Sequence, residues 1–179
     1  EMVGGQVERN TITFNAALSA CEKGGAWEPS LQLLRAMTDQ NVEWDTITCS
    51  AAVSACEKGG GMWESAVQLL GEMGEVLVER DTIIFNAAIS CCRKSGALEL
   101  ALQFLREMVT CQVKRSTVTF NATISACGQD GAWEPALQFL REMVEARIQR
   151  NTITYSAAIS VCEKGTAWRP ALQLLHEMA

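Results

Sequence analysis

Short polar side chains recur at two fixed places along the chain, and they are the residues best suited to hydrogen-bond a ligand. Asn, Asp and Ser all donate or accept hydrogen bonds at short reach. If these residues were purely structural, those at the first place would be helix N-caps and those at the second would be ordinary residues of a first helical turn. That interpretation explains the residue types but not why both places vary while their neighbours stay fixed. The two sets are Asn10, Asp45, Asp81, Ser116 and Asn151, and Asn15, Ser50, Asn86, Asn121 and Ser156.

These residues recur because the whole sequence is repetitive. The stretch that begins Asn10-Thr-Ile-Thr-Phe-Asn15 returns after steps of 35, 36, 35 and 35 residues. A fixed period in this range predicts a solenoid of stacked repeats. The one-residue surplus is an extra glycine in the turn Gly59–Gly61. We expect five units, at about 10–44, 45–80, 81–115, 116–150 and 151–179, and residues 1–9 as the tail of a preceding repeat.

Each unit has the pattern of two helices. In the first unit, Phe14, Leu18 and Cys21 fall on one helical face, and Gly24-Gly25 is the expected end of that helix. A second helix begins near Trp27 and continues its apolar face to Met37. The later first helices are predicted at about Thr46–Lys58, Thr82–Lys94, Thr117–Gln129 and Thr152–Lys164, and the later second helices at about Trp63–Met73, Leu98–Met108, Trp133–Met143 and Trp168–Met178.

A large apolar residue opens each second helix. An aromatic row of this kind suits either a base-stacking platform or a packing wedge between helices. We favour the wedge, because a leucine takes the same place in one unit and area burial explains that exchange. Trp44 lies in a connector and has no evident equivalent in the other units. The residues in the row are Trp27, Trp63, Leu98, Trp133 and Trp168.

The composition limits the possible functions. The 179 residues carry a net charge of −6, which argues against non-specific nucleic-acid binding but leaves room for a local basic stripe. No apolar run approaches the roughly 18 residues of a membrane span, so no membrane insertion is expected. The lone histidine, His176, lies in a final helical turn, and no serine or cysteine has a base beside it. We therefore expect no enzyme activity, no small-molecule substrate and no cofactor.

Five cysteines recur at one place in the units, where a small buried apolar residue is the simplest interpretation. Equivalent side chains of neighbouring helices lie about 10 Å apart, which is too far for a disulfide. The sequence contains no Cys-x-x-Cys pair, so a zinc site is not expected. These cysteines are Cys21, Cys56, Cys92, Cys127 and Cys162.

The units resemble pentatricopeptide (PPR) repeats of the plain 35-residue type. The resemblance rests on Thr-Ile-Thr-Phe-Asn-Ala-Ala-Leu-Ser-Ala-Cys-Glu-Lys-Gly and on Ala-Leu-Gln-Phe-Leu-Arg-Glu-Met, and it covers essentially the whole chain. It implies an all-α fold, a right-handed superhelical α-solenoid of helix-turn-helix repeats. It also implies single-stranded RNA as the partner, with one base read per repeat by two or three side chains.

The resemblance assigns roles to particular residues. Its base-reading pairs correspond to Asn15 with Asp45, Ser50 with Asp81, Asn86 with Ser116 and Asn121 with Asn151, while Ser156 lacks a partner; the family's code reads these pairs as U, G, C, and C or U. Its base-sandwiching aliphatic residues correspond to Ile12, Ile47, Ile83, Val118 and Ile153. Its phosphate-binding lysines correspond to Lys23, Lys58, Lys94 and Lys164, with Gln129 departing from the pattern.

Two functions follow as expectations. The first is a sequence-selective RNA-binding module that acts in an organelle, a mitochondrion or chloroplast, on RNA processing, stability, editing or translation. The alternative is a protein-interaction scaffold, or a structural subunit of a larger organellar assembly, in which the solenoid holds a protein partner without binding RNA. The paired polar sites and the lysine row favour the first.

Overall fold

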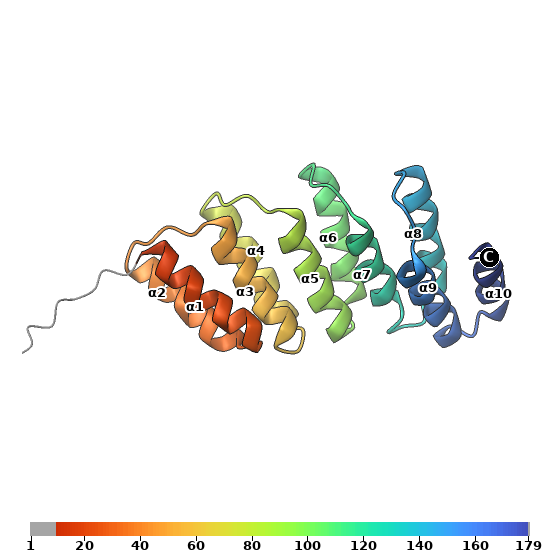
Figure 1. The fold of residues 1–179 in the computed structure, drawn as a ribbon, viewed down its shortest axis with the longest axis horizontal. Coiled ribbons are helices and arrows are strands. Elements are labelled where there is room, and N and C mark those ends of the chain that lie inside the picture. The colour runs from red at the N-terminus through yellow and green to blue at the C-terminus, as the bar shows by residue number, and fades with distance from the viewer. Residues whose placement is uncertain (1–9, 179) are drawn as a thin grey trace, which may run out of the picture.

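The computed structural model describes residues 10–178, and in this range the chain forms ten α-helices and no strand (Figure 1). The predicted all-α solenoid is confirmed; the tail predicted for residues 1–9 lies outside the described residues. The two-helix units follow one another in chain order along an elongated array (Figure 1). Their bounds are α1 Thr11–Gly24, α2 Trp27–Asp39, α3 Thr46–Lys58, α4 Trp63–Glu75, α5 Thr82–Ser95, α6 Leu98–Thr110, α7 Thr117–Cys127, α8 Trp133–Glu145, α9 Thr152–Lys164 and α10 Trp168–Glu177.

Each first helix begins directly after one of the short polar residues that precede the units. The side chains of Asn10, Asp45, Ser116 and Asn151 accept a hydrogen bond from the backbone N–H three residues on. In return the threonine there accepts a bond from the cap's own N–H, which completes a capping box. Asp81 caps the amides of Ile83 and Ile84 instead. The first polar set therefore does serve as N-caps.

Three of the second helices, α4, α6 and α8, end later than predicted. The sequence-based ends at Met73, Met108 and Met143 were each two residues too early, because the chain stays helical until a left-handed residue closes it. That residue is Leu77, Gln112 or Arg147, with φ between 54° and 58°. Glycine normally takes this position, so its absence hid the helix ends. In α7 the error runs the other way, since the helix ends at Cys127, not Gln129.

The odd-numbered helices pack against one another along the array, and each also packs on its even-numbered partner. Their inner faces form the core, in which Phe85 and Phe104 meet edge to face at 6.5 Å between ring centroids. The even-numbered helices are spaced further apart. Grooves of ≈ 360, ≈ 280 and ≈ 350 Å³ separate α2 from α4, α6 from α8 and α8 from α10. The odd-numbered helices thus form the tighter row, as a curved solenoid requires.

The tryptophans that open the second helices pack between units. Trp27, Trp63 and Trp133 are half-buried against the core, whereas Trp168 is 64% exposed. A Cβ placed on Gly59 would lie 2.6 Å from Cδ1 of Trp27, so the ring rests directly on the next unit's turn. This agrees with the wedge interpretation and leaves no open stacking platform at the first three.

Trp44 does have equivalents, which corrects the sequence analysis. It directly precedes an N-cap residue, as Arg80, Arg115 and Arg150 do. Each arginine lies over the aromatic ring of its own first helix, at 5.9 Å for Phe85 and 5.2 Å for both Phe120 and Tyr155. In the second unit Cys49 replaces the aromatic residue and Trp44 replaces the arginine. The large aromatic residue of this pair thus comes from the connector, and Trp44 packs against the core cluster that includes Cys49.

All eight cysteines are free, and six are buried. Burial raises the pKa of the Cys56 and Cys127 thiols to about 11 and, with a smaller effect of the Asp45 and Glu72 charges, that of Cys49 to about 12. Thiols of this kind are poor nucleophiles. The repeated cysteines are therefore core residues, with Cys21 the least buried of the five.

The turn glycines supply the first testable prediction. A Cβ on Gly59 would lie 2.6 Å from the carbonyl oxygen of Gly25, whereas a Cβ on Gly24 would meet nothing within 4 Å. We expect Gly59→Ala to lower the free energy of unfolding by about 1–3 kcal/mol, the usual cost of overpacking. Gly24→Ala, in the last turn of α1, should be neutral or stabilising by up to about 1 kcal/mol. Urea denaturation followed by circular dichroism measures both, and equal effects would contradict the prediction.

Candidate nucleic-acid interface

The second unit shows how the predicted site residues come together. Ile47 and Ser50 from α3 and Asp81 and Ile83 from the start of α5 line one hollow of ≈ 200 Å³. Thr46 and Ala51 of α3 and Ser19 and Glu22 of α1 complete its lining. Two of the first four residues were predicted to sandwich a base and the other two to read its edge. The hollow is smaller than the clefts of roughly 300–1,000 Å³ that hold drug-sized ligands. Its size and its mixed apolar and polar lining suit one planar heterocycle.

The aliphatic residues predicted to sandwich bases form an exposed row. Each is the second residue of a first helix, and each exposes between 61% and 77% of its surface. β-Branched aliphatic side chains usually lie in the core. A row of them at repeat spacing therefore marks a surface that is suited to apolar contact. The row consists of Ile12, Ile47, Ile83, Val118 and Ile153.

In the first unit the two predicted base-reading residues bond to each other. Nδ2 of Asn15 donates to both carboxylate oxygens of Asp45, at 3.2 and 3.1 Å. The hydroxyl of Thr48 donates to Oδ1 of Asn15 at 2.7 Å and also lies 2.8 Å from Oδ1 of Asp45. Asn15 comes from α1 and the other two from the start of α3, so the cluster spans two units.

The threonine bond recurs in two further units. The Thr119 hydroxyl donates to Oδ1 of Asn86, and the Thr154 hydroxyl donates to Oδ1 of Asn121, both at 2.7 Å. Ser50 differs, because the residue that occupies the threonine position opposite it is the buried Ile84. Sequence reasoning missed these threonines. The signal was present, since each asparagine at this place is followed 33 residues later by threonine.

The Asp45 carboxylate has a lowered pKa. Burial, the largest single influence, raises it, but the hydrogen bonds from the Thr48 amide and hydroxyl, from Asn15 and from the Ile47 amide together outweigh burial. The carboxylate therefore stays ionised and accepts from its neighbours. The Asn151 amide caps α9 in the same geometry, so a neutral residue also fits this position.

Two of the predicted phosphate lysines already tie neighbouring units together. Nζ of Lys58 lies 2.8 Å from a carboxylate oxygen of Glu22, and Nζ of Lys94 donates to the Glu57 carbonyl at 2.6 Å. Gln129, which replaces lysine, likewise donates to the Arg93 carbonyl, at 3.4 Å. All four lysines, Lys23, Lys58, Lys94 and Lys164, are exposed. Their cationic ends therefore lie at the surface near the helix ends.

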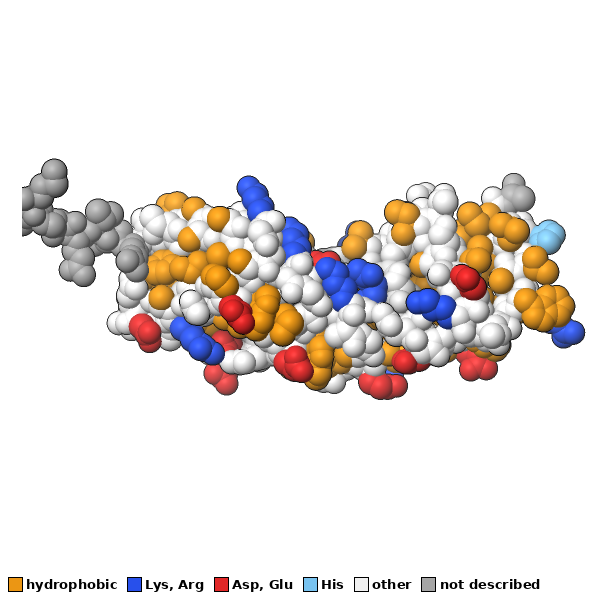
Figure 2. Space-filling model, turned by 90° about the horizontal axis from the view of Figure 1, so that it is seen from below, with side chains coloured by type: hydrophobic (Ala, Val, Ile, Leu, Met, Phe, Trp, Pro, Cys, Tyr) orange, Lys and Arg blue, Asp and Glu red, His pale blue; other side chains and the backbone are white. Residues whose placement is uncertain are grey.

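Charge is unevenly spread over the molecule. On the face that Figure 2 shows, Lys and Arg side chains gather near the middle, and Asp and Glu side chains lie along one edge. Within residues 10–178, no three His, Cys, Asp or Glu residues are grouped so that they could hold a metal ion, and no helix is long and apolar enough to cross a membrane.

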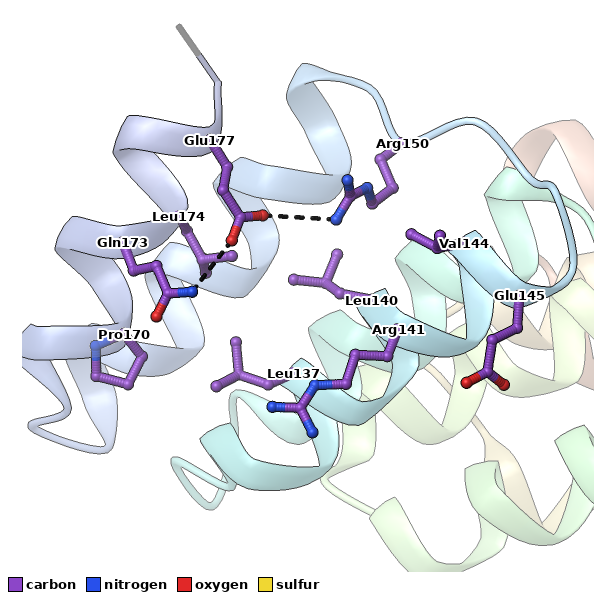
Figure 3. Close-up of a pocket in the computed structure, with 10 residues that line it drawn as sticks. All are labelled: Leu137, Leu140, Arg141, Val144, Glu145, Arg150, Pro170, Gln173, Leu174 and Glu177. Atoms are coloured by element: carbon purple, nitrogen blue, oxygen red, sulfur yellow. Dashed lines mark hydrogen bonds and ion pairs between the residues drawn. The ribbon is translucent and has the colours of Figure 1, made fainter.

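Another hollow lies between the second helices. Figure 3 shows the groove between α8 and α10, with Leu137, Leu140 and Leu174 in its floor. Arg150 and Glu177 pair across it at 3.6 Å. Arg115 and Glu142 form the same pair at 3.4 Å, and Arg80 pairs with Glu107. These groups neutralise each other and do not converge on a vacant polar site, so they tie units together.

Comparison with known proteins identifies the family. A model described as the PPR repeat family matches residues 115–164, and one described as the PPR repeat matches residues 83–113. The chain therefore contains PPR repeats. The predicted resemblance is thereby confirmed. No curated protein sequence matches the chain.

Solved structures of other PPR proteins have the same fold. The crystal structure of PPR10 from maize is 25% identical over 96% of this chain, with a TM-score of 0.76. PPR10 in complex with an 18-nucleotide psaJ RNA element is 24% identical, with a TM-score of 0.80. The PPR domain of Arabidopsis thaliana protein-only RNase P 1, in complex with tRNA, is 13% identical over 93% of this chain and 87% of its own length, with a TM-score of 0.78. The chain spans about a quarter, 24%, of PPR10.

The lowered pKa of Asp45 gives a pH prediction. A carboxylate whose folded-state pKa lies below its unfolded value stabilises the fold above the unfolded pKa, and this contribution is lost as the pH falls through the folded pKa. We expect Asp45→Asn to keep the cap but to remove this dependence. The difference in unfolding free energy between the native chain and the variant should be constant above about pH 5. Below that pH the native chain should lose stability relative to the variant. Urea titrations at several pH values measure it, and a pH-independent difference would contradict the assignment.

Proposed function

We propose that this PPR array is a sequence-selective, single-stranded RNA-binding module in which each junction between units receives one nucleotide. The observation that carries the proposal is the second-unit hollow, where Ile47 and Ile83 flank a space that Ser50 and Asp81 line. The two aliphatic side chains suit the faces of a base, and the two polar side chains suit its edge. Single-stranded RNA offers both, because its bases can be splayed out of a stack.

The remaining junctions repeat this arrangement with other polar residues. The equivalent positions of the other units hold the pairs Asn15 with Asp45, Asn86 with Ser116, and Asn121 with Asn151, and each unit also carries an exposed aliphatic residue of the row. Different polar pairs on one repeated scaffold suit different bases. RNA-bound relatives support the proposal, since PPR10 was solved with an RNA element and the PPR domain of protein-only RNase P 1 with tRNA. As in the family generally, we place the function in an organelle, on RNA processing, stability, editing or translation.

A protein-interaction scaffold is the second candidate. The groove between α2 and α4 is lined by Leu31, Leu34, Trp44 and Val76 and measures ≈ 360 Å³. Val76 is 52% exposed. This outer surface suits an apolar segment of a protein partner, and its occupation is compatible with RNA on the row of first helices.

The binding experiment tests the RNA proposal directly. We expect a labelled single-stranded RNA that contains U-G-C-C to bind more tightly than a shuffled control in fluorescence anisotropy. The affinity should fall as salt rises, because phosphate contacts release counterions. Asp45→Ser copies the Asn86–Ser116 pair and keeps a residue that caps well. It should move the preference at the first of these nucleotides from U to C and leave the other three unchanged. Equal binding of all sequences by the native chain would refute the proposal.

The lysine row has a test of its own. Lys58→Ala should weaken binding to every RNA sequence alike and reduce the salt slope by about 0.7, because a phosphate contact carries no base information. Arg141→Ala is the matched control, since it removes one positive charge from the outer groove between α8 and α10. An equal loss of affinity in both variants would show that only the total charge matters.

A further inference from the structure

We infer that Thr48, Thr119 and Thr154 are positioning residues that fix the side-chain amide of the asparagine in the preceding unit, so that it offers its NH₂ group, and not its oxygen, to the bound base. The inference rests on the proposed function and deepens it. The third residue of a first helix thereby takes part in recognition at the preceding junction. The chemical group of the ligand that is recognised there is a hydrogen-bond acceptor.

The first step is the fixed geometry of the contact. The three threonine side chains are fully buried, with 0% exposed surface, whereas the asparagines they contact are half-buried. In all three cases the hydroxyl lies 2.7 Å from Oδ1 of the asparagine. A buried side chain of this kind has little freedom to turn away. The asparagine oxygen is thus held inward, toward the core.

The second step is the direction of the bond. In each capping box the threonine oxygen accepts from the backbone N–H of the N-cap residue, at 3.3, 3.0 and 3.2 Å for Asp45, Ser116 and Asn151. A hydroxyl has a single proton to donate. Thr13, for which no earlier unit lies within the described residues, donates its proton to the Asn10 carbonyl in its own turn, at 2.8 Å. In the three later threonines the hydroxyl lies 2.7 Å from the asparagine oxygen of the neighbouring unit. This is shorter than its distance to the side chain of its own N-cap residue, which is 2.8 Å for Asp45, 3.2 Å for Ser116 and 2.9 Å for Asn151.

A charge fixes the direction further in the first unit. Nδ2 of Asn15 lies against the ionised carboxylate of Asp45. A flipped amide would place its oxygen against that carboxylate, and two acceptors in contact repel each other. The threonine and the aspartate therefore select the same orientation, which leaves the second N–H of Asn15 as the donor for a ligand.

The exception in the second unit supports this role. There the buried Ile84 takes the threonine position, and the asparagine position of the preceding first helix holds Ser50. Helix α5 still has a capped start, because Asp81 accepts from the amides of Ile83 and Ile84 at 2.9 Å. Capping alone therefore does not require the threonine. A serine hydroxyl turns freely and both donates and accepts, so it needs no partner to fix its polarity.

The ligand chemistry follows from this difference. At the junctions of Asn15, Asn86 and Asn121 an N–H donor is presented, which selects a base edge with an acceptor such as a pyrimidine carbonyl oxygen. At the Ser50 junction both donors and acceptors are accepted, and the ≈ 200 Å³ hollow provides the space. Each threonine thereby determines that the asparagine of the preceding unit presents a hydrogen-bond donor to the ligand.

The test compares Thr48→Val with Thr13→Val. Both variants lose a capping-box hydroxyl, but only the first loses a bond to an asparagine of another unit. We expect Thr48→Val to reduce base discrimination at the nucleotide read by Asn15 by roughly tenfold, the effect of about one hydrogen bond. Discrimination at the other nucleotides should not change. Thr48→Ser, which keeps the hydroxyl, should restore it, and Thr13→Val should leave all discrimination unchanged.

A second readout is independent of RNA. In ¹⁵N-correlated NMR spectra of the full chain, the side-chain NH₂ signals of Asn15 should shift and exchange faster with solvent in Thr48→Val than in Thr13→Val. Unchanged Asn15 signals, or unchanged discrimination in a variant that binds RNA, would overturn the inference. Absence of base preference in the native chain would instead refute the proposed function, and the NMR comparison would then decide the role of Thr48 by itself.

Discussion

The structure depends on the contact between successive first helices. A two-helix unit cannot bury its own apolar face, so each odd-numbered helix packs between its neighbours in the row. This contact sets the beginning of one first helix beside the first turn of the preceding one. The N-cap of a unit therefore lies next to a polar side chain of the unit before it, as Asp45 lies next to Asn15. Stability and the candidate binding site arise from the same contact.

This arrangement explains how the candidate site varies without loss of the fold. Helix N-caps accept Asn, Asp and Ser with similar stability, and the chain uses all three at this place. The residue type at the cap is thus available for recognition while the capping bond is kept. In the proposed complex the neighbouring aliphatic residue needs no such variation, because every base has a π-face. The proposal thus assigns the variable residues of the repeat to the edge of a base and the constant ones to its faces.

Sequence reasoning succeeded where one local rule decides the outcome and failed where two units decide it together. The period, the helix starts and the packing of Trp27 follow from spacing and side-chain type within one unit. The late ends of α4, α6 and α8 were missed because non-glycine residues such as Leu77 adopt the left-handed conformation there. The Trp44–Cys49 exchange and the Thr48–Asn15 bond were missed because each joins positions whose relation only the packed structure shows. Lys58 was assigned from the family pattern, and its pairing with Glu22 depends on the neighbouring helix.

The acidic net charge of −6 is compatible with RNA as the proposed partner because charge is only one part of the binding energy. Exposed aliphatic residues such as Ile47 and Ile83 lose water when a base enters between them, and this gain does not depend on the charge of the protein. The lysines are not removed from use by their present contacts. An exposed ion pair such as Lys58–Glu22 contributes about 0–1 kcal/mol, so exchanging the carboxylate for a phosphate costs little. In the proposed complex the apolar row thus supplies affinity without sequence preference, the lysines hold the backbone, and the asparagine–threonine bonds determine which base edges are accepted.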